Sequence, residues 1–535
     1  MAFIDPQLKT EDELKAGGDV IKPISDLERE YDFIVCGAGS SGSVIARRLA
    51  EDPTATVLLI EAGGNDIVPE VRNPLLWPMN LGSARDWGFI AEPDVNLANR
   101  RLLMSMGKVL GGGSGVNVMV WARGHRSDWD YFAQEAQDKT WSHESVSEIF
   151  RRIENWQGKA DAKYRGKDGP VWVQPPVDPG PLALATLEAA AALGIERFES
   201  QNGQMMEGEG GAALIDMIIR DGERHSIFQA YIRPWLRQSN LTVLINASVQ
   251  RLVLDGKMAT GVQVKINDEN LFLRARSEVV VSLGAINTPK LLMLSGIGDE
   301  TELKRHDISV IQHLPGVGKN LQDHVTFPCV WCSEEPLPLG NNGGEVTVYW
   351  KSEAGREAPD ILLCQVAFPY RSREMMAKGL PDFGWTMVCG LAHPKSRGEV
   401  RLRSPNPDDM PILDMRFFSH PDDMETTLRG MKFCRELGNS SAFAPLGIAE
   451  ALPGDLNERE MRQYIREVAG TFHHQSCSAK MGTDSMSVVD GQLRVYGIEK
   501  LRVADASVMP RITTGNTMAP SVAIGEIAAR SIRNA

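Results

Sequence analysis

Two short apolar runs, joined by a glycine-rich turn and a helical pattern, open the main part of the chain. Residues 31–36 read Tyr-Asp-Phe-Ile-Val-Cys and end at Gly37, which predicts a buried parallel strand. Residues 43–51 have apolar positions at helical spacing, and residues 56–60 form a second apolar strand that ends in Glu61. The pattern therefore predicts a β-α-β unit.

Later segments carry further signals of buried strands and amphipathic helices. Strands are expected at residues 240–252, 261–266, 277–282 and 501–504, with a turn at Asp255-Gly256 between the first two. Helices are expected at residues 181–193, after the strand at 277–282 through Leu294, and at 517–532, where apolar positions step by three and four.

The pattern changes between residues 323 and 464. Strand-like stretches alternate there with loops, which is typical of an antiparallel sheet with one exposed face. The stretches are residues 327–332, 345–350, 361–366, 386–390 and 399–403, and a helix is expected over 420–440.

A chain of 535 residues is too long for one hydrophobic core, so two packed domains are expected. We predict an α/β fold with a discontinuous Rossmann-like domain built on a parallel sheet, and a substrate domain with a mainly antiparallel sheet covered by helices. The first domain takes residues 31–160, 210–320 and 465–535, and the second takes 161–209 and 321–464. The polar residues 1–30 are expected to form an arm that wraps the body or a second subunit.

Charge and cysteine content narrow the functional classes. A net charge of -13 disfavours nucleic acid and anionic membranes as partners. No signal peptide and no apolar run of transmembrane length is evident, and reduced cysteines favour a cytoplasmic location. Cys329 and Cys332 are the one close cysteine pair, and buried thiols are a better interpretation than redox or metal chemistry. No histidine pair has ligand spacing, so no metal is expected, and the oligomeric state stays open.

The glycine-rich turn reads Gly37-Ala-Gly39-Ser-Ser-Gly42, and Glu61 follows Gly42 by 19 positions. Such glycines allow a tight turn, the approach of backbone N–H groups to a pyrophosphate and close packing of helix on strand. A carboxylate at the end of the second strand can accept ribose hydroxyls, although Glu61 could also be a surface acid. The turn predicts a dinucleotide site without deciding between FAD and NAD.

Several segments in order resemble the glucose-methanol-choline (GMC) oxidoreductase family over most of residues 31–535. The resemblance implies FAD, an alcohol substrate and a six-stranded sheet that caps the flavin, with bacterial alcohol, sorbose and pyridoxine-type enzymes as the most similar subgroup. The segments are residues 107–124, 284–298, 315–324, 474–482, 503–510 and 514–517, with residues 393–398 favouring the subgroup.

The resemblance also implies roles for single residues. Asn117, Met119 and Val120 match positions that line the isoalloxazine ring, Asp505 matches one near the pyrophosphate or ribityl chain, and the backbone of Val249 is expected near adenine. Trp87 is either a cofactor contact or a core tryptophan. The full set of cofactor contacts expected is Gly37, Gly39, Ser40, Ser41, Gly42, Glu61, Ala62, Trp87, Gly107, Val109, Gly112, Gly113, Asn117, Met119, Val120, Val249, Gly284, Ala285, His473, Asp505, Ala506, Asn516, Thr517 and Met518.

Two departures from the family pattern stand out. The family often has His-Pro at the catalytic position, where this chain has His474-Gln475. Members that bind FAD covalently use a histidine near the position of Met104, and residues 103–107 contain no His, Cys or Tyr. We therefore expect FAD to be bound non-covalently.

The expected chemistry is oxidation of a primary or secondary alcohol, in which His474 takes the hydroxyl proton, Asn516 binds the substrate oxygen and flavin N5 takes the hydride. His473 and His474 should point to opposite faces of an extended segment, so that only one faces the substrate. The final electron acceptor is oxygen or a quinone- or dye-type compound. A non-redox lyase resembling hydroxynitrile lyases is the alternative function, and a flavoprotein without catalysis or a nicotinamide-dependent enzyme is disfavoured.

Overall fold

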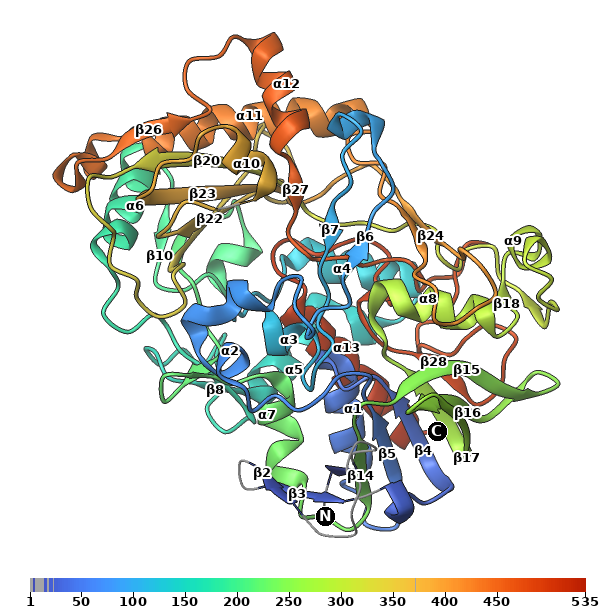
Figure 1. Ribbon diagram of the computed structural model, residues 1–535. Helices are drawn as coiled ribbons and strands as arrows, with labels where there is room; N and C mark the ends of the chain where they lie inside the picture. The colour runs from blue at the N-terminus through green and yellow to red at the C-terminus, as the bar shows by residue number, and fades with distance from the viewer. Residues whose placement is uncertain (1–2, 5–13, 17–18, 23, 371) are drawn as a thin grey trace.

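Two large sheets lie at opposite ends of the molecule, with helices and long loops between them (Figure 1). The computed structural model describes residues 3–4, 14–16, 19–22, 24–370 and 372–535. None of the helices formed by these residues has the length and apolar composition needed to cross a bilayer.

The first sheet is parallel at its centre, as the sequence predicts. β17, β4, β5 and β14 pair in that order and in parallel, and β28 joins the sheet beside β17. The antiparallel β15 and β16 extend it at one edge, and the short β1, β3 and β2 at the other. The strands are β1 (Phe3–Ile4), β2 (Leu14–Ala16), β3 (Asp19–Lys22), β4 (Glu30–Cys36), β5 (Val57–Ile60), β14 (Leu241–Leu244), β15 (Ser248–Asp255), β16 (Met258–Ile266), β17 (Glu269–Val281) and β28 (Leu501–Val503).

One predicted strand is divided in two. The stretch 240–252 forms β14 and the start of β15, because Asn246 between them has a φ of 53° and turns the chain. The turn at Asp255-Gly256 lies between β15 and β16 as expected. The predicted N-terminal arm falls partly outside the described residues. Its described part adds β1, β2 and β3 to the sheet edge at β14.

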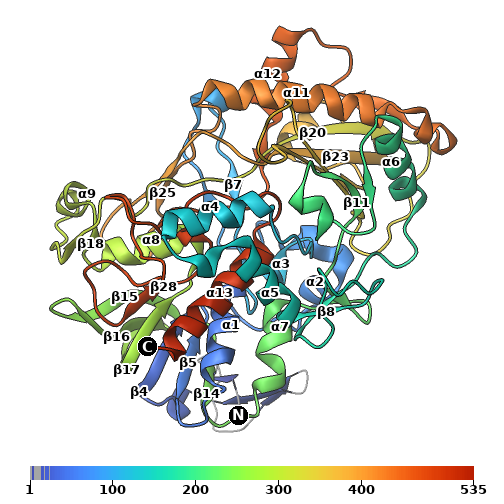
Figure 2. The ribbon, with the colours of Figure 1, turned by 180° about the vertical axis from the view of Figure 1, so that it is seen from behind.

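Helices α1 and α13 pack side by side against the first sheet, which Figure 2 shows from behind. Their close approach depends on Gly525, where a Cβ atom would lie 2.8 Å from the carbonyl oxygen of Ser41. The helices of the described residues are α1 (Ser40–Leu49), α2 (Pro69–Arg72), α3 (Gly113–Val116), α4 (Arg126–Ala136), α5 (His143–Ile153), α6 (Pro181–Ala192), α7 (Ile227–Tyr231), α8 (Gly284–Leu294), α9 (Glu300–Arg305), α10 (Arg373–Ala377), α11 (Pro421–Gly438), α12 (Glu458–Val468) and α13 (Met518–Arg533).

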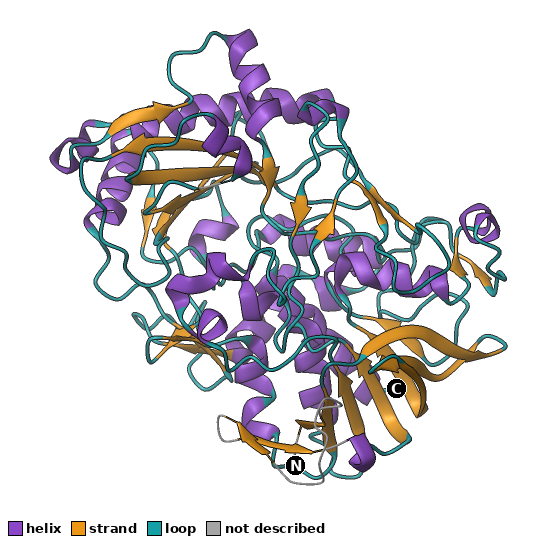
Figure 3. Cartoon of the chain, viewed as in Figure 1, coloured by secondary structure: helices purple, strands orange, loops and turns teal. Residues whose placement is uncertain are grey.

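The second sheet has eight strands and is mainly antiparallel (Figure 3). Four of the predicted strands form its centre, whereas the stretch 399–403 becomes β24 (Glu399–Arg401) and pairs with β25 (Ile412–Asp414) elsewhere. The eight strands are β10 (Arg197–Phe198), β11 (Gly211–Leu214), β20 (Val325–Cys332), β21 (Val346–Trp350), β22 (Ile361–Val366), β23 (Gly384–Leu391), β26 (Ala449–Leu452) and β27 (Gly470–Thr471).

The prediction that this sheet has one exposed face is wrong. Nearly all residues of β20, β21, β22 and β23 are buried. Helix α11 covers one face, where Gly430 would meet Ile361 and Phe327 if it carried a Cβ atom. The other face closes a cavity between the two sheets. The exact domain boundaries stay a prediction.

Candidate functional site

A cavity of about 300 Å³ lies between the two sheets. It brings together residues from the glycine-rich turn, α13 and the second sheet. Twenty of the residues named from the sequence line it: Gly37, Gly39, Ser40, Ser41, Glu61, Ala62, Trp87, Gly107, Gly112, Gly113, Asn117, Val120, Gly284, His473, His474, Asp505, Ala506, Asn516, Thr517 and Met518. Gly42, Val109, Met119, Val249 and Ala285 do not line it.

The glycine-rich turn has the close contacts that such a turn requires. Gly37 has a φ of 101°, and a Cβ atom there would lie 2.3 Å from the carbonyl oxygen of Ser282. A Cβ atom on Gly42 would lie 1.9 Å from the carbonyl oxygen of Gly37, which explains a glycine at a position outside the cavity wall. Gly39 caps α1 without a side-chain hydrogen bond. The N-terminal N–H groups of α1 are therefore suited to an anionic ligand such as a pyrophosphate.

Glu61 is buried, so the interpretation as a surface acid is wrong. Its carboxylate accepts hydrogen bonds from the N–H groups of Ala38 at 3.0 Å and Gly63 at 2.9 Å. Burial raises the pKa of this carboxyl group to about 7, and the two N–H donors oppose the rise. The side chain lies at the end of β5 and faces the cavity, where it could accept hydrogen bonds from ribose hydroxyls.

Asp505 occupies the corresponding place after β28. It accepts hydrogen bonds from the N–H groups of Gly284 at 2.9 Å and Ser507 at 2.8 Å, and from the hydroxyl of Thr288 at 2.6 Å. These contacts fix the start of α8 at the cavity wall. Burial raises the pKa of the Asp505 carboxyl group.

The side chain of Asn117 contacts Met119, Arg224 and Met518. Its Oδ1 atom accepts from the N–H of Met119 at 2.9 Å and from Nη1 of the buried Arg224 at 2.9 Å. Its Nδ2 atom lies 3.1 Å from Sδ of Met518 at the start of α13. Met119 itself has a φ of 61° and is fully buried, so its side chain packs in the core and does not reach the cavity.

His474 lies between two nitrogen atoms. Its Nε2 atom is 3.2 Å from Nδ2 of Asn516, and its Nδ1 atom is 2.9 Å from Nδ1 of His324. Because an amide nitrogen donates, Nε2 accepts, and the ring proton sits on Nδ1 and is donated to His324. Burial lowers the pKa of His474 well below its usual value, and His324 and His473 lower it further. The arrangement provides a neutral imidazole whose Nε2 atom is unprotonated.

The expectation that His473 and His474 point to opposite faces is wrong. His473 has a φ of 60°, so the segment is not extended there, and both imidazoles line the cavity. The Nδ1 atom of His473 is buried and has no hydrogen-bond partner among the described residues. Burial lowers the pKa of His473 to about 4.

Asp323 fixes the loop that carries His474, and the sequence did not single it out, although it lies in the segment 315–324. Its carboxylate accepts from the N–H of His474 at 3.0 Å, from Nε2 of Gln475 at 3.1 Å and from the hydroxyl of Thr471. The loop that carries His474 is thereby fixed. The contact also gives Gln475 a role at the position where the family often has proline, because only the amide can donate to Asp323.

The second sheet supplies the remaining wall, and none of its residues was identified from the sequence. Alternation along a strand does not tell which face meets a ligand when both faces are buried. Gly344 also lines the cavity, in the loop at residues 341–344 before β21. The wall residues from this sheet and the segment after β22 are Thr326, Val346, Cys364, Gln365, Val366, Tyr370, Val388 and Thr471.

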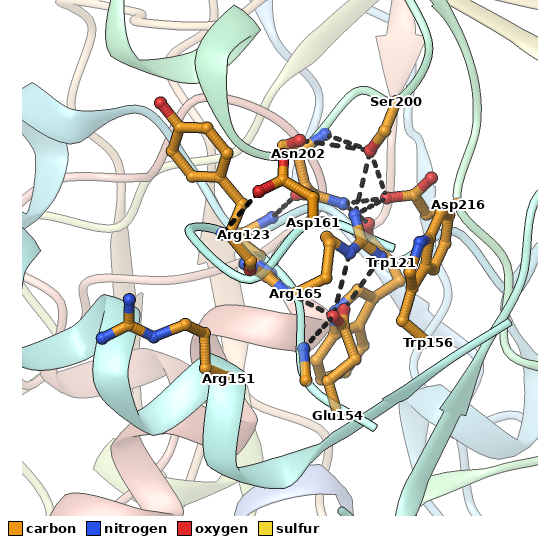
Figure 4. Close-up of polar contacts among 12 residues, drawn as sticks. Trp121, Arg123, Arg151, Glu154, Trp156, Asp161, Arg165, Ser200, Asn202 and Asp216 are labelled. Carbon is orange, nitrogen blue, oxygen red and sulfur yellow. Dashed lines mark hydrogen bonds and ion pairs between the residues drawn. The ribbon is translucent and has the colours of Figure 1, made fainter. Parts of the chain in front are cut away.

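A buried ionic network supports one side of the cavity (Figure 4). Arg165 lies 2.9 Å from Glu154 and 2.6 Å from Asp216, and Arg123 lies 2.6 Å from Glu154. The N–H of Trp121 donates to the carbonyl oxygen of Asp216 at 2.7 Å. The network therefore joins the two chain segments that carry the cavity residues Val120 and Ile215.

Cys329 is not paired with Cys332. Its Sγ atom instead lies within 4.8 Å of those of Cys389 and Cys434, in the core of the second sheet. Cys332 points elsewhere and donates to the carbonyl oxygen of Ala449. Burial raises the pKa of Cys389 and of Cys434 well above the usual value, which favours neutral, packed thiols.

The site fits FAD on its own contacts. Gly37, Gly39, Gly112 and Gly113 line the cavity, two strand-end carboxylates face it, and buried polar atoms such as Oδ1 of Asn516 have no partner among the described residues. The N-terminus of α13, at Thr517 and Met518, also opens on the cavity and has no side-chain cap.

Comparisons with known proteins agree with this picture. Two family models, both described as GMC oxidoreductase, match residues 31–326 and 394–525. Oxygen-dependent choline dehydrogenase from Brucella anthropi is 36% identical over 94% of this chain and 95% of the relative. Pyridoxine 4-oxidase from Mesorbium loti superimposes with a TM-score of 0.89 at 32% identity, covering 94% of this chain and 99% of that one. A formate oxidase from Aspergillus oryzae, solved to study modification of its FAD, gives a TM-score of 0.86 at 25% identity, covering 94% and 98%.

Proposed function

The chain belongs to the GMC oxidoreductase family, a family of FAD enzymes that oxidise alcohols, and on this premise we propose that it converts a primary or secondary alcohol to an aldehyde or ketone with His474 as the general base. The observation that carries the proposal is the contact between Nε2 of His474 and Nδ2 of Asn516 at 3.2 Å in the cavity wall. A hydroxyl group that lies against both atoms from the cavity would donate its proton to Nε2 and take over the hydrogen bond that the amide now donates to the ring.

The surroundings of His474 support this role. The low pKa keeps the imidazole neutral and ready to accept a proton at neutral pH. The Nδ1 atom of His474 donates its proton to His324, and the backbone N–H of His474 donates to the carboxylate of Asp323 at 3.0 Å. The ring is therefore fixed before the substrate binds. When bound, FAD supplies the hydride acceptor.

The names of two relatives point to test substrates. They give choline and pyridoxine as the compounds on which those proteins act. We propose oxygen or a quinone- or dye-type compound as the final electron acceptor of this chain, and a non-covalent association with FAD.

The proposal is tested by anaerobic reduction. The purified, FAD-loaded protein is mixed without oxygen with a panel of sugars, aryl alcohols, alkanols, polyols and hydroxymethyl heterocycles, including choline and pyridoxine. Loss of the oxidised flavin absorbance with at least one alcohol is expected. A lyase would leave the absorbance unchanged while it cleaved a cyanohydrin, and an unchanged spectrum with every alcohol would refute the proposed oxidation.

A further inference from the structure

Arg224 is a buried cation that forms no ion pair with any of the described residues. It ends the short strand β13 (Glu223–Arg224), and its exposed fraction is 5%. Every other buried arginine of the described residues forms an ion pair, Arg123 and Arg165 with Glu154 and Arg502 with Glu278. Because an unpaired charge in a protein interior is costly, Arg224 is expected to act on a negative charge that the protein itself does not supply.

Neutral oxygen atoms hold the guanidinium group of Arg224 in place. Its Nε atom donates to the carbonyl oxygen of Val71 at 2.7 Å, and its Nη1 atom donates to the carbonyl oxygen of Ser114 at 3.2 Å and to Oδ1 of Asn117 at 2.9 Å. The Nη2 atom is buried and has no hydrogen-bond partner among the described residues. Burial lowers the pKa of Arg224 to about 9, so the group stays charged at neutral pH. The side chain is therefore fixed, and its charge is not neutralised.

The side chain of Asn117 separates this charge from the cavity. Asn117 lines the cavity, whereas Arg224 does not, so the guanidinium acts on a ligand there through space and not by contact. Nη1 of Arg224 and the N–H of Met119 both donate to Oδ1 of Asn117. The amide is thereby held with its Nδ2 atom next to Met518, at the start of α13. In the interior such a charge is screened far less than in water.

We infer that the unpaired charge of Arg224 stabilises the negative charge that FAD gains on two-electron reduction, and so raises the midpoint potential of the bound cofactor. The inference rests on the proposed alcohol oxidation. In that reaction the hydroxyl proton goes to His474, and the hydride from the alcohol carbon adds one negative charge to the flavin. A nearby cation without a counterion favours the reduced over the oxidised cofactor. The free-energy cost of the buried charge is thus offset most when the flavin is reduced.

The midpoint potential tests this role without any substrate. The FAD-loaded protein is reduced slowly together with a reference dye, and the absorbance gives the ratio of reduced to oxidised flavin at the potential of the dye. Arg224→Met removes the charge, and this ratio should fall at least about tenfold, or about 30 mV for a two-electron couple. Arg220→Met is the matched control in the paired strand β12 (Ile219–Arg220), because Arg220 is exposed and its charge is screened by solvent.

A double-variant cycle separates the charge from the position of the Asn117 amide. Asn117→Ala removes the amide and leaves the guanidinium in place. Arg224→Met should lower the ratio of reduced to oxidised flavin by a similar factor in the Asn117→Ala background, because the charge acts through space. Loss of the effect in that background would mean that Arg224 acts only by holding Asn117, and would overturn the electrostatic role.

Two further outcomes bear on the same inference. An unchanged or higher ratio in FAD-loaded Arg224→Met overturns it, including the case in which FAD binds more weakly, since the phosphate groups carry the same charge in both redox states. If Arg224→Met does not retain FAD, Arg224→Gln is measured instead, because its amide can still donate to one carbonyl oxygen. Failure of every alcohol to reduce the flavin would refute the proposed oxidation and leave the measured potentials valid.

Discussion

The Nε2 atom of His474 lies 3.2 Å from Nδ2 of Asn516, although the two residues are 42 positions apart and the chain between them passes through β28. The contact leaves the lone pair of Nε2 as the acceptor in the cavity. The proton on Nδ1 is engaged by His324, so the tautomer is fixed from the opposite side of the ring. A base with a fixed tautomer and a fixed backbone needs one change before it takes a proton, which is the transfer of the Asn516 hydrogen bond from Nε2 to the substrate oxygen.

Removal of this base should slow the reaction and leave the cofactor in place. His474→Ala should lower the rate of flavin reduction by the best alcohol by about 10²–10⁴-fold, measured anaerobically by stopped flow. His313→Ala, at an exposed position, is the matched control and should be unaffected. Unchanged reduction in His474→Ala would exclude His474 as the base, and loss of FAD would show that its role is structural.

The pH profile should reflect a histidine whose pKa is depressed by burial. The folded-state pKa of His474 lies well below the usual value, so the free base persists as the pH falls through about 6.5, the ordinary pKa of histidine. The rate of flavin reduction should therefore be constant across this pH and fall only at lower values. Measurement of the reduction rate against pH tests this, and an apparent pKa near or above 7 for the base would contradict it.

FAD should leave the protein when the fold is lost. Residues 103–107 contain no His, Cys or Tyr, and Met104, near the position that carries the flavin in covalent members, is a buried residue of β7 (Leu103–Met104). Precipitation with trichloroacetic acid should release the yellow cofactor into the supernatant, as followed by its absorbance. Colour that stays in the pellet after washing would indicate a covalent bond.

The parts of the site that follow from local sequence could be predicted, and the parts that depend on long-range contacts could not. Gly37 and Glu61 belong to one β-α-β unit, so their spacing in the sequence predicts that both lie at the same ligand site. The contact of Asp323 with the N–H of His474 joins residues 151 positions apart, and no periodic pattern in the sequence indicates it. The left-handed backbone of His473 was also hidden, because non-glycine residues rarely adopt it.

The fold shows the same division. The central strands of both sheets lie within a few residues of the runs that predicted them, because apolar strands and glycine turns are local features. The burial of the second sheet on both faces could not be predicted from alternation, since it depends on α11 on one side and the cavity on the other. For the same reason Gln365 and its neighbours in the wall were not identified.

Because of Asp323, the stability of the folded state should fall as the pH rises. A carboxylate that is paired with a cation gives the opposite dependence. Burial raises its pKa from 3.8 to about 7, so between these values the folded state holds a proton that the unfolded state has lost. Its contribution to stability is present at low pH and is lost as the pH rises toward about 7. The Tm of the wild type minus that of Asp323→Asn should therefore fall from pH 5 to 7 and stay level above 7. Asp307→Asn, at an exposed position, is the control. If the Tm difference between the wild type and Asp323→Asn instead grows with pH, the N–H donors stabilise the ionised carboxylate of Asp323.

The buried network in Figure 4 should be essential for stability rather than for proton transfer, because none of its charged groups lines the cavity. Glu154 lies 2.6 Å from Arg123 and 2.9 Å from Arg165, and Glu154→Gln leaves two buried guanidinium groups with Asp216 as the remaining carboxylate. Breaking such a pair costs about 3–5 kcal/mol. For a chain of this length the cost corresponds to a fall in Tm of about 3–5 °C. Glu148→Gln, on the exposed side of α5, is the matched control. If the two variants have the same Tm, the network contributes no net stability. The segments that carry Val120 and Ile215 must then be held by their backbone contacts alone.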